Sequence, residues 1–369
     1  MKIASFNVEN LFERVKAMNE PPATARDILN DYAKLNSLLA RPTYSSADKA
    51  SILALLKKYK LQKAGESEFF LLRENRGHLF QRETASKPAA ITAGGRGDWI
   101  GWLELKPAPV NAVAISNTGR VISDLNADVL AVVEAEDRPS LMRFNKIVLA
   151  EYPDAPYYHV MLIDGNDERG IDVGIMTRES YPITSIESHV DDHDGNERIF
   201  SRDCAGYRID LPSGKQVWIL INHLKSKGYG DFAKSNEKRK KQAQRVRDIY
   251  DTLVQTDPFV AVVGDFNDTP DSDPLDPLLG NGSTLKDVSS HPGFDDGGRP
   301  GTYANGAASN KIDYILCSPK LFEKITGGGI YRMGVWGGKN GDLFPHYDTI
   351  TGPEEAASDH AAIWGEFDL

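Results

Sequence analysis

The stretch Phe259-Val-Ala-Val-Val-Gly-Asp-Phe-Asn267 joins an apolar run to a short polar segment. Residues 259–263 predict a strand, because a short β-branched run bounded by glycine is typical of strands. Asp265 and Asn267 follow directly after it. Taken alone, residues 264–267 suit an Asx turn equally well. The other strand ends therefore decide whether these polar side chains belong to a site.

Polar residues that are able to bind a metal stand at the other predicted strand ends too. They are Asn7 and Glu9 after residues 3–6, Glu134 after 129–133, His223 after 217–222, Asp313 within 312–316, and Asp359 and His360 before 361–367. Strands set side by side project their end residues into one crevice. Carboxylate and amide oxygens are the ligands that Mg²⁺ prefers. The set holds no cysteine and no closely spaced histidine pair, which favours magnesium or manganese over zinc.

Each of these residues also has a purely structural explanation. Glu134 suits a helix cap, His223 suits a hydrogen-bonded structural histidine, and Asp359-His360 suits the end of a loop. Their occurrence together, each at a strand end, favours a functional site.

The predicted strands outnumber the predicted helices. Further strands are expected at residues 157–163, 171–176 and 207–211. A helix is expected at 234–255, where Ala243, Val246, Tyr250 and Leu253 recur at helical spacing. Many strands with few helices between them predict a layered α/β fold with two packed sheets.

Residues 13–110 differ from the rest of the chain. We expect a mainly helical insertion, with helices near residues 28–39 and 52–59 and a hairpin that pairs residues 69–72 with 99–102. This segment carries 16 basic and 11 acidic residues, a net charge of +5, whereas the remainder carries −15. It is either a basic surface that steers an anionic substrate or a solvated helical insertion. Elsewhere, the glycine-rich segments 327–329 and 337–341 predict loops or turns.

The composition excludes several classes of protein. The 369 residues are 40% hydrophobic and 26% charged, as in an ordinary globular chain. The longest apolar runs have five or six residues, far short of the about 20 that a membrane-spanning helix needs. Residues 1–7 read as a strand and not as a signal peptide. We therefore expect a cytoplasmic protein without stable membrane association. The net charge of −10 opposes long-range attraction to nucleic acid, although a bound metal ion reverses the local sign.

The ordered motifs resemble the endonuclease/exonuclease/phosphatase superfamily. They are Ser5-Phe-Asn7, Glu134 after its strand, Asn222-His-Leu-Lys-Ser226, Gly264-Asp-Phe-Asn267, Lys311-Ile-Asp-Tyr-Ile315 and Ser358-Asp-His360. This group includes deoxyribonuclease I-like nucleases, exonuclease III-like abasic-site endonucleases, inositol polyphosphate 5-phosphatases and neutral sphingomyelinases. The resemblance implies an α/β/β/α sandwich of four layers, formed by two facing sheets with outer helices. It covers residues 1–12 and about 112–369, so the chain is expected to be a single catalytic domain interrupted by residues 13–110.

The resemblance also implies roles by position. Glu134 would be the principal ligand of Mg²⁺ or Mn²⁺. Asn7 and Asp359 would complete or support the same shell, and Glu9 occupies the position of a second carboxylate.

The remaining motif residues would carry the chemistry. His360 would act as general base or as electrostatic partner of the phosphate, with Asp313 orienting its ring. Asp265 would position or deprotonate the attacking water. Asn267 and His223 would donate hydrogen bonds to the phosphoryl oxygens.

Four residues outside these roles are further candidates. Arg169, Arg202 and Lys225 are expected to bind the substrate phosphate, and Asp172 is expected to support His223. A strand-end ion pair explains Arg169 and Asp172 equally well. Residues 234–247 carry seven basic residues and one acidic residue. They form either a grip on a polyanion or a solvated helix face.

The leading hypothesis is a Mg²⁺-dependent phosphodiesterase, a nuclease that hydrolyses DNA or RNA by in-line attack of water. The alternative is a phosphoesterase for a small phosphorylated molecule or a phospholipid headgroup. A non-catalytic binding protein of the same fold ranks third, because the full residue set is present. No protein partner is implied.

Overall fold

The computed structural model describes residues 1–11, 15–84, 86–108, 111–167, 169–227 and 231–369. The chain divides into two compact units, Met1–Phe12 with Val110–Leu369, and Glu13–Pro109. The larger unit contains every candidate residue of the site. None of the helices that the structure describes is both long and apolar enough to cross a membrane.

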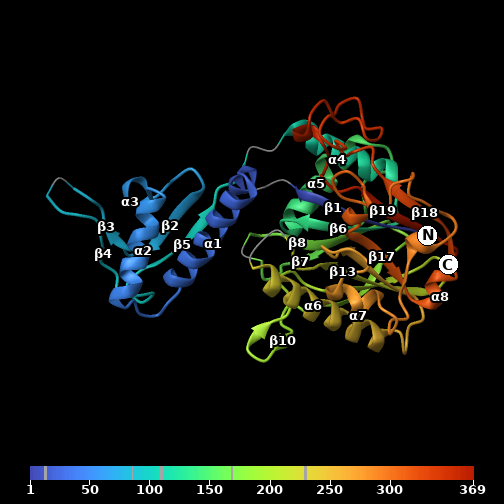
Figure 1. Cartoon of the computed structure of the whole chain (residues 1–369), viewed down its shortest axis with the longest axis horizontal. Helices are drawn as coiled ribbons and strands as arrows, with labels where there is room; N and C mark the ends of the chain where they lie inside the picture. Colours follow the sequence, from blue (N-terminus) through green and yellow to red (C-terminus); the bar gives the residue numbers. More distant parts are fainter. Residues whose placement is uncertain (12–14, 85, 109–110, 168, 228–230) are drawn as a thin grey trace. The chain divides into compact units, whose positions relative to one another are not determined.

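Two sheets form the centre of the larger unit (Figure 1). In spatial order, the first sheet contains β16 (Phe294–Asp295), β18 (Ile325–Tyr331), β19 (Ala362–Phe367), β1 (Lys2–Leu11), β6 (Val129–Ala135), β8 (Asp172–Thr177) and β7 (His159–Ile163). The second contains β15 (Lys286–Asp287), β17 (Asp313–Cys317), β14 (Val260–Asp265), β13 (Gln216–His223), β12 (Ala205–Asp210) and β9 (Ile183–Glu187). The nine strands predicted from the sequence are all present, with bounds shifted at most by a few residues.

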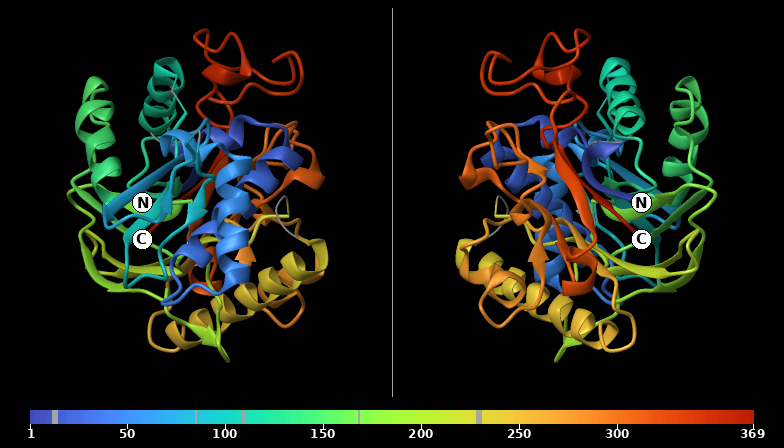
Figure 2. Two further views of the ribbon diagram at one scale, coloured as in Figure 1. Left: turned by 90° about the vertical axis from the view of Figure 1, so that its left-hand side faces the viewer. Right: turned by 90° about the vertical axis from the view of Figure 1, so that its right-hand side faces the viewer.

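Helices cover the outer face of each sheet. Helices α4 (Ala112–Leu125) and α5 (Arg138–Ile147) lie against the first sheet, and α6 (Phe232–Leu253) and α7 (Asp276–Leu279) lie against the second. Figure 2 shows α4 and α5 on the opposite side of the paired sheets from α6. The fold is therefore the expected four-layer α/β/β/α sandwich.

Strand β6 shows why apolar runs specify this architecture. Val129, Ala131 and Val133 point into the core between the sheets, whereas Leu130 and Val132 point into the core beneath α4 and α5. Successive side chains of a strand face opposite sides, so a strand covered on both faces must be apolar throughout. Full burial of one such side chain stabilises the fold by about 1.5–3 kcal/mol.

Short elements complete the larger unit. They are the hairpin β10 (His193–Asp194) and β11 (Glu197–Arg198), α8 (Pro319–Phe322), and the 3-10 helices η2 (Leu149–Glu151), η3 (Asp273–Leu275), η4 (Val288–Ser290), η5 (Ala308–Asn310) and η6 (Pro353–Glu355). Gly327–Gly329 lies inside strand β18, so the expectation of a loop or turn at this segment is wrong.

The smaller unit combines helices with two short sheets. Its elements are η1 (Lys16–Asn19), α1 (Pro22–Leu39), α2 (Ser46–Lys58), α3 (Leu61–Ala64), β2 (Phe70–Arg76), β3 (Phe80–Gln81), β4 (Ala90–Ile91) and β5 (Ile100–Leu105). Strand β2 pairs antiparallel with β5, but β3 and β4 lie between them in the sequence, so the pair is no simple hairpin. Trp99 is fully buried and donates a hydrogen bond to the Tyr44 hydroxyl at 2.7 Å.

Candidate active site

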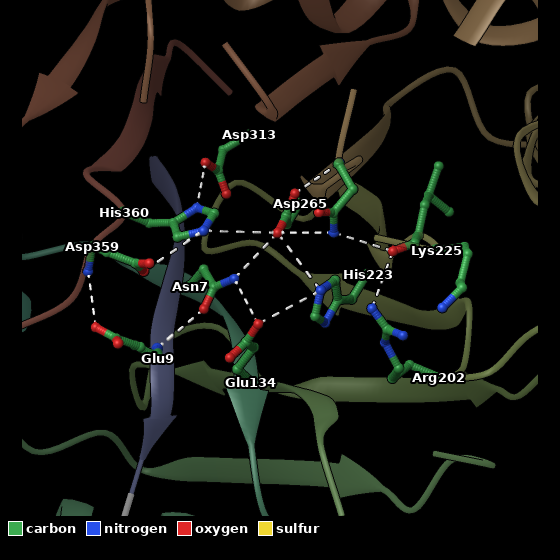
Figure 3. Close-up of polar contacts among 12 residues, drawn as sticks. Asn7, Glu9, Glu134, Arg202, His223, Lys225, Asp265, Asp313, Asp359 and His360 are labelled. Carbon is green, nitrogen blue, oxygen red and sulfur yellow. Dashed lines mark hydrogen bonds and ion pairs between the residues drawn. The ribbon is translucent and has the colours of Figure 1, made fainter. Parts of the chain in front are cut away.

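The strand directions bring the candidate residues to one edge of the two sheets. β1 and β6 run parallel in the first sheet, and β13 and β14 run parallel in the second. The carboxyl ends of these strands carry Asn7, Glu134, His223 and Asp265. β19 and β17 are antiparallel to β1 and β14, so their amino ends lie at the same edge. The residues at those amino ends, including His360, therefore join the cluster (Figure 3).

Strand β6 changes its side-chain alternation at Glu134. The pairing of β6 with β8 is irregular between Val133 and Ala135, and Glu134 has a left-handed φ of 68°. Val133 faces the core between the sheets, yet Ala135 faces the outer core. Such a bulge redirects one side chain, and left-handed non-glycine residues concentrate at functional sites. Glu9 (φ 50°) and Asn267 (φ 55°) share the left-handed backbone.

Gly264 allows the polar segment after β14 to approach β13. It has a φ of 128°, and a Cβ atom at this position would lie 1.9 Å from the Asn222 carbonyl oxygen. Only glycine fits there. This close approach sets the backbone that positions Asp265.

A half-buried carboxylate, Glu134, and a buried one, Asp265, both lie close to the same two nitrogen atoms at the centre of the site. Asn7 Nδ2 donates to Glu134 Oε1 at 3.3 Å and to Asp265 Oδ2 at 3.2 Å. His223 Nε2 lies 3.7 Å and 3.6 Å from the same two oxygens. The amide oxygen of Asn7 accepts a hydrogen bond from Glu9 N at 3.1 Å. The amide nitrogen of Asn7 therefore faces the carboxylates, whereas a metal ligand would present its oxygen.

Asp265 is the residue that connects the parts of the site. Its Oδ1 accepts a hydrogen bond from Asn267 N at 2.7 Å, and its Oδ2 accepts one from Asn267 Nδ2 at 3.2 Å. Burial, reinforced by the nearby charges of Asp313 and Glu134, raises the pKa of Asp265 to about 7. A carboxylate with such a pKa is able to accept a proton near neutral pH.

His360 forms a hydrogen-bonded pair with Asp313. Its Nδ1 lies 2.9 Å from Asp313 Oδ2. The other ring nitrogen, Nε2, faces Asp265 Oδ2 at 4.0 Å and Asp359 Oδ1 at 3.8 Å. Burial disfavours the charged ring, but Asp313 outweighs this effect and holds the pKa of His360 well above its ordinary value. The surroundings therefore favour the charged form of the imidazole.

Two hydroxyl groups that the sequence analysis did not single out hold this pair in place. Thr302 Oγ1 donates to Asp313 Oδ2 at 2.6 Å and accepts from Asp313 N at 3.2 Å. Ser358 Oγ donates to the Asn7 carbonyl at 2.7 Å and accepts from His360 N at 3.0 Å. Ser358 stands in the motif Ser358-Asp-His360, so its position was a usable signal. Thr302 lies in an irregular segment, and no pattern marks it.

His223 has the opposite electrostatic environment. Burial, followed by the charges of Arg202 and Arg169, holds its pKa well below the ordinary value. Its Nδ1 is buried without a hydrogen-bond partner. The Asp172 carboxylate, which was expected to support His223, accepts a hydrogen bond from Gly165 N at 2.8 Å, and its support of His223 stays a prediction. This carboxylate caps the turn after β7.

Arg169 and Arg202 are tied to one carboxylate. Asp167 Oδ2 accepts hydrogen bonds from Arg169 Nη2 at 2.6 Å and from Arg202 Nη1 at 3.2 Å. Arg202 is only 2% exposed, and its Nη2 donates to the Leu224 carbonyl at 3.0 Å. Direct contact between Arg202 and a phosphate therefore stays a prediction, and it would require this buried guanidinium to become exposed. Lys225 is half-buried and follows Leu224 in the chain.

The remaining expected metal ligands lie at the His360 side of the cluster. Glu9 Oε2 accepts a hydrogen bond from Asp359 N at 3.1 Å. Within the described residues, one group of histidine and carboxylate atoms is compact enough to hold an ion: Asp265, Asp313 and His360, whose ligand atoms lie within 4.8 Å of one another. Glu134 lies across from it, separated from Asp265 by the Asn7 amide.

A model of a known protein family matches the part of the chain that contains most of these residues. The profile of the Endonuclease/Exonuclease/phosphatase family matches residues 111–321, more than half of the chain. The chain belongs to this family. The match includes Glu134, His223, Asp265 and Asp313, and it ends before His360. No curated protein sequence matches the chain.

Solved structures of family members have a similar fold. The mannosyl-6-phosphatase of Bacteroides thetaiotaomicron VPI-5482 superposes with a TM-score of 0.53 at 15% identity, covering 69% of this chain and 91% of that one. An endonuclease/exonuclease/phosphatase family protein of Bacteroides thetaiotaomicron gives 0.52 at 16% identity, covering 69% and 87%. At such low identity, these similarities establish the fold alone.

Proposed function

We propose that the chain is a divalent-metal-dependent phosphodiesterase whose substrate is a nucleic acid. One observation carries the proposal: the buried carboxylate of Asp265 faces two histidines whose pKa values are shifted in opposite directions. Groups whose environments push their pKa values apart are the usual means of acid–base chemistry at one pH. Family membership supports phosphoester hydrolysis as the reaction class.

The donor set fits a hard divalent cation. Glu134 and Asp265 are close enough to share one amide nitrogen, and burial with mutual repulsion raises the pKa of Asp265. A cation beside them would relieve this repulsion. Glu134 would hold Mg²⁺ or Mn²⁺, supported by Asp359 and, after reorientation of its amide, by Asn7. The ion would neutralise the phosphate charge and stabilise the leaving oxygen.

The protein's own groups divide the proton chemistry between them. Asp265 takes the proton of the attacking water, because its pKa lies near neutrality. His360 is held as a cation by Asp313, so it stabilises the negative charge that develops on the phosphoryl oxygens and does not act as the base. His223 stays neutral and donates a hydrogen bond without adding charge.

A small phosphoester is the second candidate substrate, and one observation favours it. Most basic residues of α6 are already paired with carboxylates, which weakens the expected grip on a long polyanion. The pairs are Arg239 with Asp268, Lys240 with Asp273, Lys241 with Asp194, Arg245 with Asp192 and Arg247 with Asp251. A similar fold in a mannosyl-6-phosphatase agrees with this alternative.

A substrate panel tests the proposal. Plasmid DNA, single-stranded DNA, RNA, bis-p-nitrophenyl phosphate, an inositol phosphate and mannose 6-phosphate are incubated with the protein in Mg²⁺, Mn²⁺ or EDTA, beside Glu134→Ala and His360→Ala. We expect nucleic-acid cleavage that EDTA and both variants abolish. Turnover of only the small esters would support the second candidate, a small phosphoester substrate. Full activity of either variant would overturn the assignment of the site.

A further inference from the structure

Two half-buried lysines near Arg202 form no direct ion pair with any residue that the structure describes. Lys225 comes two residues after the end of β13, and Lys238 lies in the first half of α6. In the part of the chain that the structure describes, neither ammonium group has a hydrogen-bond or ion-pair partner. Lys240 and Lys241 of the same helix, in contrast, are each paired with an aspartate. Half-buried cations without partners are costly unless a ligand supplies the anion.

Helix α6 fixes where these two lysines lie. Gln242 Oε1 accepts a hydrogen bond from Lys225 N at 2.8 Å, and Arg239 Nη1 donates to the Lys225 carbonyl at 2.6 Å. Lys238 precedes Gln242 by four residues, so both project from the same face of the helix. The backbone of Lys225 is thus held against the helix, one turn away from Lys238.

The charges around Lys225 are predominantly positive, whereas Lys238 has Glu197 and Asp167 near it as well as Arg202. Arg202 and Arg169 share the single carboxylate of Asp167. Burial, then the charges of Arg202 and Arg169, lowers the pKa of Lys225 to about 8. Burial, then Arg202, lowers the pKa of Lys238 as well. In Figure 3, Arg202 and Lys225 both stand at the His223 end of the site. An anion bound here would relieve this repulsion.

Lys238 also lines an open space in the surface. A groove of about 500 Å³ runs between the β10–β11 hairpin and α6, and Lys234 and Arg198 line it as well. Of its three acidic residues, Asp194 and Glu237 are paired with Lys241, whereas Glu197 would compete with an anion for Lys238. The groove gives an anion access to Lys238 from the surface.

We propose that Lys225 and Lys238 form a second anion subsite, which binds a phosphate group other than the one that is hydrolysed at Asp265. This inference rests on the proposed function, since it places the subsite next to that reaction centre. It specifies the substrate class: a molecule with at least two phosphate groups. The second phosphate is either the neighbouring phosphodiester of a polynucleotide strand or a second phosphoryl group on a small molecule.

Calorimetric binding of small phosphates tests the subsite without requiring turnover. Adenosine 5′-monophosphate, adenosine 3′,5′-bisphosphate and fructose 1,6-bisphosphate are titrated into the full chain, in EDTA and again in Ca²⁺. We expect a bisphosphate to bind at least about tenfold more tightly than the monophosphate, since charge-assisted hydrogen bonds to phosphate are strong. Lys238→Gln and Lys225→Gln should each remove most of this advantage. The control Lys240→Gln, on the same helix but paired with Asp273, should retain it.

Each outcome has one meaning. A preference for the adenosine bisphosphate supports the subsite and indicates a polynucleotide. A preference for the fructose bisphosphate supports the subsite and indicates a small phosphorylated substrate. Equal binding of all three compounds, or an advantage that survives Lys238→Gln and Lys225→Gln, overturns the inference. Because binding is measured directly, an enzyme that cleaves no nucleic acid would still give a clear answer.

Discussion

The site has two ends, each built around a histidine that faces the same Asp265 carboxylate. At one end, His360 is hydrogen-bonded to Asp313 and surrounded by acidic groups, which raise its pKa. At the other end, His223 has no partner on Nδ1, and burial with two neighbouring arginines lowers its pKa. The same residue type therefore has its charged form favoured at one end and its neutral form favoured at the other.

This difference shows that the surroundings, and not the residue type, assign the chemical role. The His360 end is suited to stabilising charge on the reacting phosphate. At the His223 end, the guanidinium groups of Arg169 and Arg202 lie near Lys225. Asp265 lies between the two ends, which leaves it as the group that exchanges a proton.

Removing the charged histidine should have the largest effect. His360→Asn keeps a hydrogen-bonding side chain but loses the positive charge, so kcat should fall by roughly 10³-fold. His223→Asn keeps a neutral donor and should cost only about tenfold. Steady-state kinetics on the best substrate of the panel measure both values. Equal losses in the two variants would contradict the division of roles.

Replacing Asp313 should reduce the difference in pKa between the two histidines. Asp313→Asn loses the charge that holds the pKa of His360 high, so that pKa should fall toward its ordinary range and kcat should drop by about 10²-fold. Thr302→Ser, which retains the hydroxyl bonded to Asp313, is the matched control and should leave kcat within a few fold. An unchanged pKa of His360 in Asp313→Asn would show that another group sets it.

The buried carboxylate at the His223 end should limit stability at high pH. Burial, followed by the charges of Asp164 and Asp167, raises the pKa of Asp172 to about 7. Between about pH 4 and pH 7 the folded chain retains a proton that the unfolded chain has lost, so the free energy of unfolding falls as pH rises through this window. Asp172→Asn should therefore gain about 1–3 kcal/mol above pH 7 and little at pH 4.

Urea denaturation at both pH values measures this gain. The amide oxygen that Asp172→Asn introduces would still accept the hydrogen bond from Gly165, so the turn should be preserved. The control Asp164→Asn removes one neighbouring charge only and should give a smaller gain. A gain for Asp172→Asn that does not depend on pH would refute the assignment.

The smallest effect concerns the backbone between the two ends. Glu134 has a left-handed φ of 68°, which is unfavourable for a residue with a side chain. Glu134→Gly should be more stable than Glu134→Gln by about 1 kcal/mol, while both variants are inactive. Denaturant unfolding of the pair separates backbone strain from loss of charge. Equal stabilities would mean that the bulge stores no strain.

The central strands were predictable because burial on both faces makes them apolar throughout, as in Val129–Val133. Strand β18 was not, because Gly327–Gly329 has the composition of a turn. A Cβ atom on Gly328 would lie 2.9 Å from the Phe294 ring and from the Trp364 carbonyl oxygen, so close approach within the sheet explains the glycine. Such a requirement depends on the neighbouring strand and leaves no local pattern.

The site was predictable to the extent that its residues follow strands. Glu134, Asp265 and His360 stand at or beside strand ends, Asn7 lies within β1 where its regular pairing with β6 is interrupted, and the four residues meet. The backbone partners of Asp172 and Arg202, the Gly165 amide and the Leu224 carbonyl, were not predictable, since hydrogen bonds to backbone groups carry no residue signature. The same holds for Thr302, whose hydroxyl reaches Asp313 from an irregular segment.

A titration of the histidine ring nitrogens by ¹⁵N NMR tests the central claim most directly. The resonances of His360 and His223 are assigned with the two asparagine variants, and the full chain is titrated in EDTA. The account predicts that His360 loses its proton only at a pH well above the ordinary histidine pKa, whereas His223 gains one only at a pH well below it. Titration of both rings together, near the ordinary pKa of about 6.5, would contradict it.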